Sequence, residues 1–77
     1  MAEFQLDLRG VACPMNFVKT RLFLDKMQEG DLVCVLLDGG EPVESVSESI
    51  VQDGHTLEAR SEMTEGHFML SIRKGKE

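Results

Sequence analysis

Cys13 is the residue of this chain whose type and position best suit covalent chemistry. It stands directly before Pro14, and proline is favoured at the first position of a helix because its fixed φ suits the helix. Cys13 is therefore predicted at the N-cap, where unpaired backbone N–H groups and the positive end of the helix dipole favour thiolate over thiol. Such a thiolate is a nucleophile. The structural alternative is a small cap residue, although cysteine is not among the usual N-cap residues.

Cys34 and the histidines are candidates of another kind. Cys34 lies inside the apolar run 32–37, where a free cysteine behaves as a small hydrophobe, so we expect a buried and inert thiol. His55 and His67 share no zinc-site spacing with the cysteines, so we expect solvated histidines and no metal site. Two cysteines allow one disulfide at most, which is typical of an intracellular protein.

The elements around Cys13 follow from hydrophobic periodicity. Strict alternation over residues 4–8 predicts a strand that Arg9-Gly10 ends. Length and end signals predict a helix from Pro14 to about Gln28. Its apolar residues fall on two lines instead of one stripe: Met15, Val18 and Leu22 on one, and Phe17, Leu24 and Met27 on the other. The continuous apolar run 32–37 predicts a central strand covered on much of both faces.

A second helix and a hairpin follow. A turn at residues 38–40 leads to Glu41-Pro42, which begins an amphipathic helix that buries Val43, Val46 and Ile50, with Val51 widening that face. Gly54 ends the helix. Apolar positions at period two in residues 57–63 and 68–72 predict a β-hairpin with its turn at 64–66. Residues 73–77 form a polar tail that frays at its end.

This order of elements, β-α-β-α-β-β, predicts an α/β fold. We expect a two-layer sandwich in which a four-stranded mixed sheet carries both helices on one face. The right-handed crossover rule favours parallel pairing of the first two strands. Residues 1–77 form a single domain, because a chain this short cannot build two cores.

Composition excludes several classes of function. Fourteen acidic against eight basic residues give a net charge of −6, and the chain has neither Trp nor Tyr. We therefore expect no binding to nucleic acid or to an anionic membrane, and a protein partner with a basic patch fits better. No apolar run approaches the ~20 residues that span a bilayer, and the N-terminus has no leader pattern, so we expect a cytoplasmic protein.

Residues 6–14, LDLRGVACP, resemble the opening of the TusA/SirA-like sulfur-carrier family. The signature of that family is Leu-Asp-x-Arg-Gly-x-x-Cys-Pro-x-Pro, entering the first helix of a β-α-β-α-β-β fold. Looser similarity at Lys19-Thr20, Met27-x-x-Gly30, Gly54-His55 and residues 68–74 extends the resemblance over nearly the whole chain.

The resemblance implies a persulfide carrier rather than a turnover enzyme. Cys13 would accept a sulfane sulfur as a persulfide from a donor of the cysteine desulfurase or rhodanese type. It would then pass the sulfur to an acceptor protein, in a relay for tRNA thiolation, sulfur oxidation or a related pathway, without a cofactor. Arg9, Gly10, Pro14, Asn16 and Lys19 are the supporting residues. Lys19, with Lys26 on the same helix face, either offers positive charge near Cys13 or is a solvated flank.

The sequence departs from the family at Asn16, which replaces the second proline. This change restores an N–H that we expect to point toward the Cys13 sulfur or solvent, and it places the Asn16 side chain on the surface that a docking protein covers. It also favours an alternative function, a regulatory or adaptor domain of the same fold without sulfur transfer. Asp38-Gly39 stands where the family has an acidic pair, which would alter a docking surface.

Overall fold

The computed structural model describes residues 2–12, 14–63 and 66–76. Its elements are β1 (Glu3–Asp7), α1 (Met15–Asp25), β2 (Leu32–Asp38), α2 (Glu41–Gln52), β3 (Thr56–Glu62) and β4 (His67–Arg73). This is the predicted β-α-β-α-β-β order. Neither helix of the described ranges has the length and apolar character that a membrane span requires.

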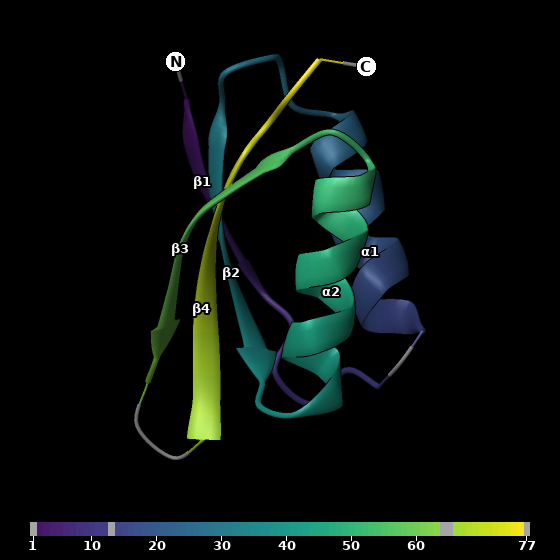
Figure 1. Cartoon of the computed structure of the whole chain (residues 1–77), viewed down its shortest axis with the longest axis vertical. Coiled ribbons are helices and arrows are strands. Elements are labelled where there is room, and N and C mark those ends of the chain that lie inside the picture. Colours follow the sequence, from purple (N-terminus) through teal and green to yellow (C-terminus); the bar gives the residue numbers. More distant parts are fainter. Residues whose placement is uncertain (1, 13, 64–65, 77) are drawn as a thin grey trace.

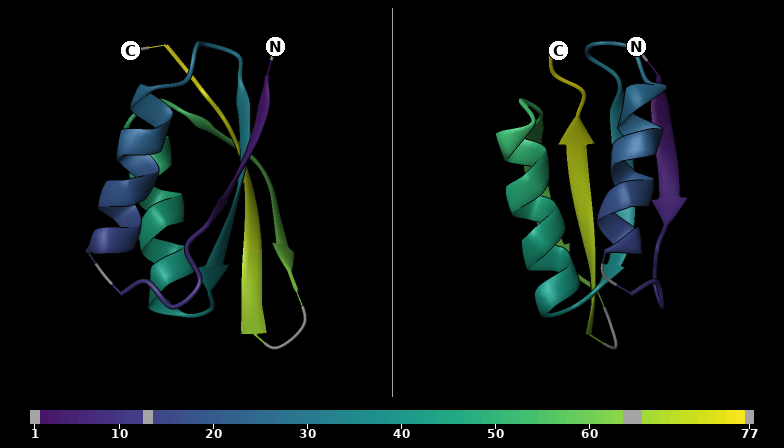
Figure 2. Two further views of the ribbon diagram at one scale, coloured as in Figure 1. Left: turned by 180° about the vertical axis from the view of Figure 1, so that it is seen from behind. Right: turned by 90° about the vertical axis from the view of Figure 1, so that its right-hand side faces the viewer.

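The strands form one mixed sheet in the order β1-β2-β4-β3. β1 pairs with β2 in parallel, whereas β4 pairs antiparallel with both β2 and β3. Both helices cover the same face of this sheet, as the two views in Figure 2 and the layers in Figure 1 show. The predicted two-layer α/β sandwich and the parallel first pair are therefore confirmed.

The hydrophobic core lies between the sheet and the helices. It is formed mainly by aliphatic side chains that are almost fully inaccessible to solvent: Val33, Val35 and Leu37 of β2, Val43, Val46 and Ile50 of α2, and Leu70 and Ile72 of β4. The α2 face was thus predicted correctly except at Val51, which is 56% exposed. Val51 lies in the last turn of α2 on its solvent side, so the predicted widening of the buried face is wrong.

The other face of the sheet has no covering layer among the described residues, and this corrects the predictions for β2. Burial alternates along β2, so Leu32, Cys34 and Leu36 are half-buried on the open face instead of being covered. The Cys34 Sγ lies 3.8 Å from the Ser71 Oγ of β4. Cys34 therefore lies outside the core. Side chains along a strand alternate between its two faces, and the helices cover only one face of this sheet, so every second residue of the apolar run stays partly exposed.

The β3–β4 hairpin is present but its faces change along β3. A register shift between Leu57 and Ala59 places Leu57 opposite the core residue Ile72 and Ala59 opposite Ser71 of the open face. The predicted single face from residue 57 to residue 63 is therefore wrong, because a bulge inserts one residue and reverses the alternation.

The predicted frayed tail is tied down at Lys74 and Gly75. Lys74 is 4% exposed, and its Nζ donates a hydrogen bond of 2.8 Å to the carbonyl oxygen of Leu24, in the last turn of α1. The Gly75 N–H donates to the His55 Nδ1 at 3.0 Å, and a Cβ at Gly75 would collide with the carbonyl oxygen of Gly54. His55 is accordingly buried, contrary to the predicted solvated histidine.

Candidate functional site

The predicted site lies at one edge of the sandwich. Because β1 and β2 are parallel, their carboxyl ends meet at the same edge, and both helices begin there (Figure 2). The N-terminal ends of helices carry unpaired N–H groups and a positive partial charge. Residues 8–12, which follow β1, and Pro14, which precedes α1, therefore lie at this edge.

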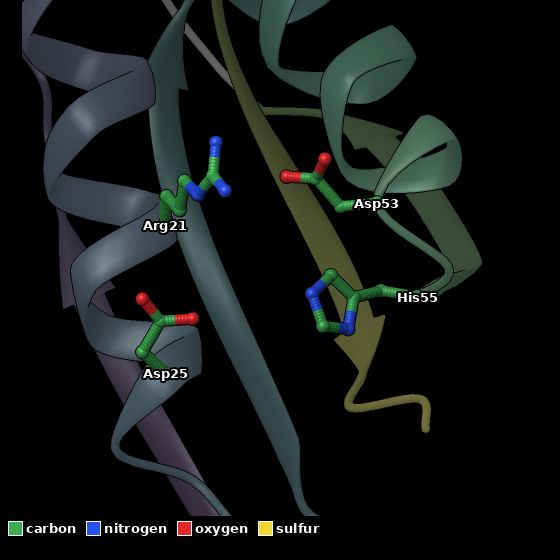
Figure 3. A pocket seen from close by; sticks show the side chains of 4 residues that line it. All are labelled: Arg21, Asp25, Asp53 and His55. Atoms are coloured by element: carbon green, nitrogen blue, oxygen red, sulfur yellow. The ribbon is translucent and has the colours of Figure 1, made fainter. Parts of the chain in front are cut away.

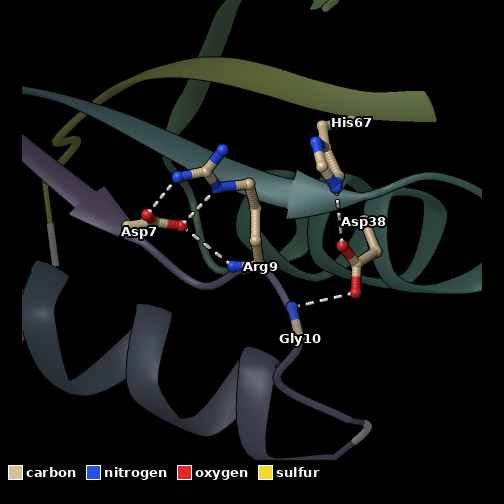
Figure 4. A network of polar contacts seen from close by, with 5 residues as sticks. All are labelled: Asp7, Arg9, Gly10, Asp38 and His67. Carbon is tan, nitrogen blue, oxygen red and sulfur yellow. Dashed lines mark hydrogen bonds and ion pairs between the residues drawn. The ribbon is translucent and has the colours of Figure 1, made fainter. Parts of the chain in front are cut away.

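Asp7 and Arg9 hold the beginning of this segment. Arg9 donates from its Nε and Nη2 atoms to the two carboxylate oxygens of Asp7, at 2.9 and 2.7 Å. The Arg9 backbone N–H donates to the same carboxylate at 3.1 Å (Figure 4). The side-chain hydrogen bond from Arg9, aided by the backbone one, lowers the pKa of Asp7 to about 2. Arg9 thus fixes the turn after β1, although its side chain remains exposed.

Asp38, the last residue of β2, holds the next part of the segment. Its Oδ2 accepts a hydrogen bond of 2.9 Å from the Gly10 N–H, and its Oδ1 lies 3.5 Å from the His67 Nε2 (Figure 4). Gly10 has a φ of 78°, a left-handed conformation that glycine adopts without a steric penalty. Asp38 therefore joins the segment to the sheet, and His67 stands beside it at the start of β4.

The sequence analysis missed these roles of Asp7, Asp38 and His67. A signal was present for Asp38, because parallel pairing of the first two strands brings residue 38 beside Arg9-Gly10. From the sequence, Asp38-Gly39 was predicted only to alter a docking surface. His67, predicted as solvated, is half-buried against Asp38.

The start of α1 differs from the prediction in two respects. The N-cap is Pro14, with φ −90° and ψ 6°, so the helix begins at Met15, one residue later than expected. Asn16 is completely buried, and its N–H donates to the Ala12 carbonyl oxygen at 3.2 Å. The expected orientation of this N–H toward sulfur or solvent, and the expected surface position of the side chain, are therefore wrong.

Asn16 makes hydrogen bonds with two residues of its own helix. Its Oδ1 accepts a hydrogen bond of 2.6 Å from the Phe17 N–H, and its carbonyl oxygen accepts one of 2.8 Å from the Thr20 hydroxyl. Thr20 is also completely buried. The Asn16 Oδ1 and the Thr20 hydroxyl thus have their hydrogen bonds within the helix.

Lys19 remains at the surface of α1, and Cys13 itself lies outside the described residues. The structure therefore brings Arg9, Gly10, Pro14 and Asn16 to the two ends of one short connection. The predicted cap position of Cys13 is wrong, because the N-cap of α1 is Pro14, whereas the reactivity of Cys13 remains a prediction.

The surface also carries two hollows, the second of which reaches Asp7. A cleft of about 430 Å³ is lined by Arg21 and Asp25 of α1 and by Asp53 and His55 after α2 (Figure 3). A shallow groove of about 400 Å³ on the open sheet face is lined by residues that include Cys34, Leu36 and Met69. Within residues 2–12, 14–63 and 66–76, no group of His, Cys, Asp and Glu side chains could hold a metal ion.

Known proteins resemble the chain over nearly its whole length. The family model described as sulfurtransferase TusA matches residues 4–74. A protein of Archaeoglobus fulgidus named "Putative sulfur carrier protein" is 33% identical over 69 residues, covering 90% of this chain and 78% of that protein. One of Neisseria meningitidis serogroup A, named in the same way, is 36% identical over 69 residues, covering 88% and 90%. The solved structure of a SirA-like protein from Desulfitobacterium hafniense has the same fold, with a TM-score of 0.81 at 20% identity over 95% of this chain and 99% of that one.

Proposed function

Because this chain belongs to the sulfurtransferase TusA family, we propose that it is a sulfur carrier that holds sulfane sulfur as a persulfide on Cys13. A donor protein supplies the sulfur, and an acceptor protein receives it. The observation that carries the proposal is the LDLRGVACP run of residues 6–14, which lies within the family match and leads directly into α1.

The transfer is an exchange at sulfur. The Cys13 thiolate attacks the outer sulfur of a donor cysteine persulfide and forms a new S–S bond. The donor's own S–S bond breaks, and its cysteine leaves as a thiolate that takes up a proton from solvent. One sulfur atom changes protein without net oxidation or reduction, so no cofactor is required. The rate of such an exchange depends on the thiolate fraction and on access to the attacking sulfur.

The geometry around the connection supports this chemistry. Asp7 and Asp38 fix Arg9 and Gly10 through hydrogen bonds at the surface. The connection joins β1 to α1 at the edge where both helices begin, and the positive end of a helix dipole favours a thiolate or a persulfide anion at Cys13. Specificity then depends on protein contacts rather than on a substrate pocket.

Mass spectrometry tests the proposal directly. After incubation with a cysteine desulfurase and cysteine, the protein should gain the mass of one sulfur atom, and a reductant should remove it. Cys13→Ser should abolish the gain and keep the fold, because serine has nearly the same size and shape as cysteine but no thiol. The matched control is Cys34→Ser, which should load normally. Loading that survives Cys13→Ser, or is lost in Cys34→Ser, would contradict the proposal.

Asn16→Pro separates a working carrier from the adaptor alternative. This change restores the family proline and removes the N–H that donates to Ala12, together with the side-chain acceptor for Phe17. Proline is tolerated in the first turn of a helix, so we expect a small loss of stability and unchanged loading. If the natural protein fails to load while Asn16→Pro loads readily, the chain is an adaptor that has lost the chemistry.

A further inference from the structure

The solvent-facing side of α1 exposes large apolar side chains in a line. Met15, Val18 and Leu22 are 48%, 37% and 56% exposed, and their spacing of three and four residues places them on one side of the helix. The same helix buries Asn16 and Thr20 completely. Burial of polar side chains and exposure of apolar ones on the same helix is not explained by the stability of the fold. Exposed apolar patches commonly mark interaction sites.

Two lysines accompany the apolar line. Lys19 follows Met15 by four residues and Lys26 follows Leu22 by four, so both ammonium groups flank it. Both lysines are exposed, and none of the ion pairs between described residues involves either of them. The exposed acid of the helix, Asp25, lies on another flank, where it lines the cleft with Arg21. We call Met15, Val18, Lys19, Leu22 and Lys26 the α1 outer face.

This face is apolar and basic on a chain whose net charge is −6. The contrast matters because charge complementarity between surfaces selects partners and accelerates association. A second copy of the chain would bring the same lysines against each other across a two-fold axis, which is unfavourable. A surface that combines apolar side chains with aspartate and glutamate fits both properties of the face.

We propose that the α1 outer face is the docking surface for the proteins that exchange sulfur with Cys13, and that these partners present an apolar surface bearing carboxylates. The inference rests on the proposed function. The face begins two residues after Cys13 in the sequence, so a partner that brings a sulfur atom to Cys13 also covers the first turn of α1. Its interface is small and partly electrostatic, as in complexes that form and separate quickly.

Two sulfur donors separate docking from thiol chemistry. Inorganic polysulfide loads a reactive thiol without any protein surface, whereas a cysteine desulfurase supplied with cysteine must dock. We expect Leu22→Ser and the double change Lys19→Glu with Lys26→Glu to slow loading from the desulfurase about fivefold or more, with loading of Leu22→Ser from polysulfide unchanged. Raising the salt concentration should slow the natural protein toward the rate of the double variant.

The chain offers matched controls for both changes. Val51 of α2 is 56% exposed, the same as Leu22, so Val51→Ser removes an equally exposed apolar side chain from the other helix. Lys76 is likewise exposed and belongs to none of the ion pairs between described residues, so Lys76→Glu is the charge control. Both controls should load at the natural rate from either donor.

A zero-length carbodiimide cross-link identifies the contacting charges. It should join Lys19 or Lys26 to an aspartate or glutamate of the desulfurase. Cross-links that instead join carboxylates of this chain to donor lysines would overturn the proposal, as would equal slowing by the controls. The docking proposal would also fail if the desulfurase loads the protein no faster than polysulfide does.

Further outcomes assign the face to another occupant or reject the function. Sedimentation as a dimer that Leu22→Ser dissociates would assign the α1 outer face to a second copy. Retention on anionic vesicles that the double lysine variant abolishes would assign it to a membrane, and either result overturns the proposal. Failure of Cys13 to load even from polysulfide rejects the proposed function itself, and the docking inference with it.

Discussion

The two helices lie on the same face of one sheet, yet they bury opposite kinds of residue. α2 turns Val43, Val46 and Ile50 into the core and leaves its glutamates in water. α1 buries Asn16 and Thr20 together with Leu24, and it leaves Met15, Val18 and Leu22 exposed. α2 therefore follows the ordinary rule for an amphipathic helix, whereas α1 departs from it on both sides.

α2 thus contributes mainly to the core, whereas α1 leaves much of its apolar surface exposed. Every large apolar side chain of α2 except Val51 contributes to the core. In α1 the core contribution falls to Leu24, aided by Phe17 and Phe23 at the margin. The helix that departs from the rule directly follows Cys13, where the proposed function requires surface for contact with partners.

The largest effect that tests this comparison comes from truncating one apolar side chain in each helix, buried in α2 and exposed in α1. Ile50→Ala should lower the free energy of unfolding by about 2–5 kcal/mol, because it removes a buried side chain and leaves a cavity. Leu22→Ala should change it by less than about 0.5 kcal/mol, since Leu22 is already in water. Denaturant unfolding measures both. Similar losses for the two variants would show that the α1 outer face takes part in the fold.

A smaller effect is expected at the C-terminal end of α1. Lys74→Met removes the ammonium that donates to the Leu24 carbonyl and should lower the free energy of unfolding by about 1–3 kcal/mol. Lys76→Met, at an exposed lysine two residues further along, should be nearly neutral. At the end of α2 no lysine hydrogen bond of this kind is found among the described residues. The turn at the left-handed residue Gly54 instead lets backbone N–H groups of residues 53–55 donate to carbonyl oxygens of the last turn. Equal losses of stability in Lys74→Met and Lys76→Met would show that the hydrogen bond from Lys74 to Leu24 does not stabilise the end of α1.

The smallest effect is a pH dependence at the end of β1, on the edge of the sandwich where α1 begins. The pKa of Asp7 is lowered to about 2 from 3.8, so its carboxylate stabilises the fold fully above pH 4. That contribution is lost as the pH falls through about 2, where the folded state also binds the proton. Asp7→Asn should therefore be less stable than the natural protein at pH 5, with the difference vanishing near pH 2.

Unfolding by denaturant at a series of pH values, with and without salt, measures this difference. Because the Asp7–Arg9 pair is exposed, added salt should reduce it. A difference that stays constant down to pH 2 would show that Asp7 contributes through its shape rather than its charge.

Hydrophobic periodicity predicted the fold correctly where the spacing of apolar residues corresponds to a single buried face. The α2 face and the parallel β1–β2 pair followed from spacing and handedness alone. Lys74 could not be predicted in this way, because its burial depends on Leu24, a partner that only the tertiary fold brings close. Asn16 makes hydrogen bonds with Phe17 and Thr20 of its own helix, and its burial was missed because polar residues are ordinarily expected at the surface. Cys34 was misplaced because an unbroken apolar run conceals which side of a strand is covered.

The place of β4 in the sheet has a consequence during synthesis on the ribosome. β4 lies between β2 and β3, so β3 has no strand partner until residues 67–73 have emerged. A nascent chain that stops before β4 can form only the β1–β2 pair, with the apolar edge of β2 unpaired. The helix that follows Cys13 therefore gains its complete support late, and shorter chains are the ones that chaperones should bind.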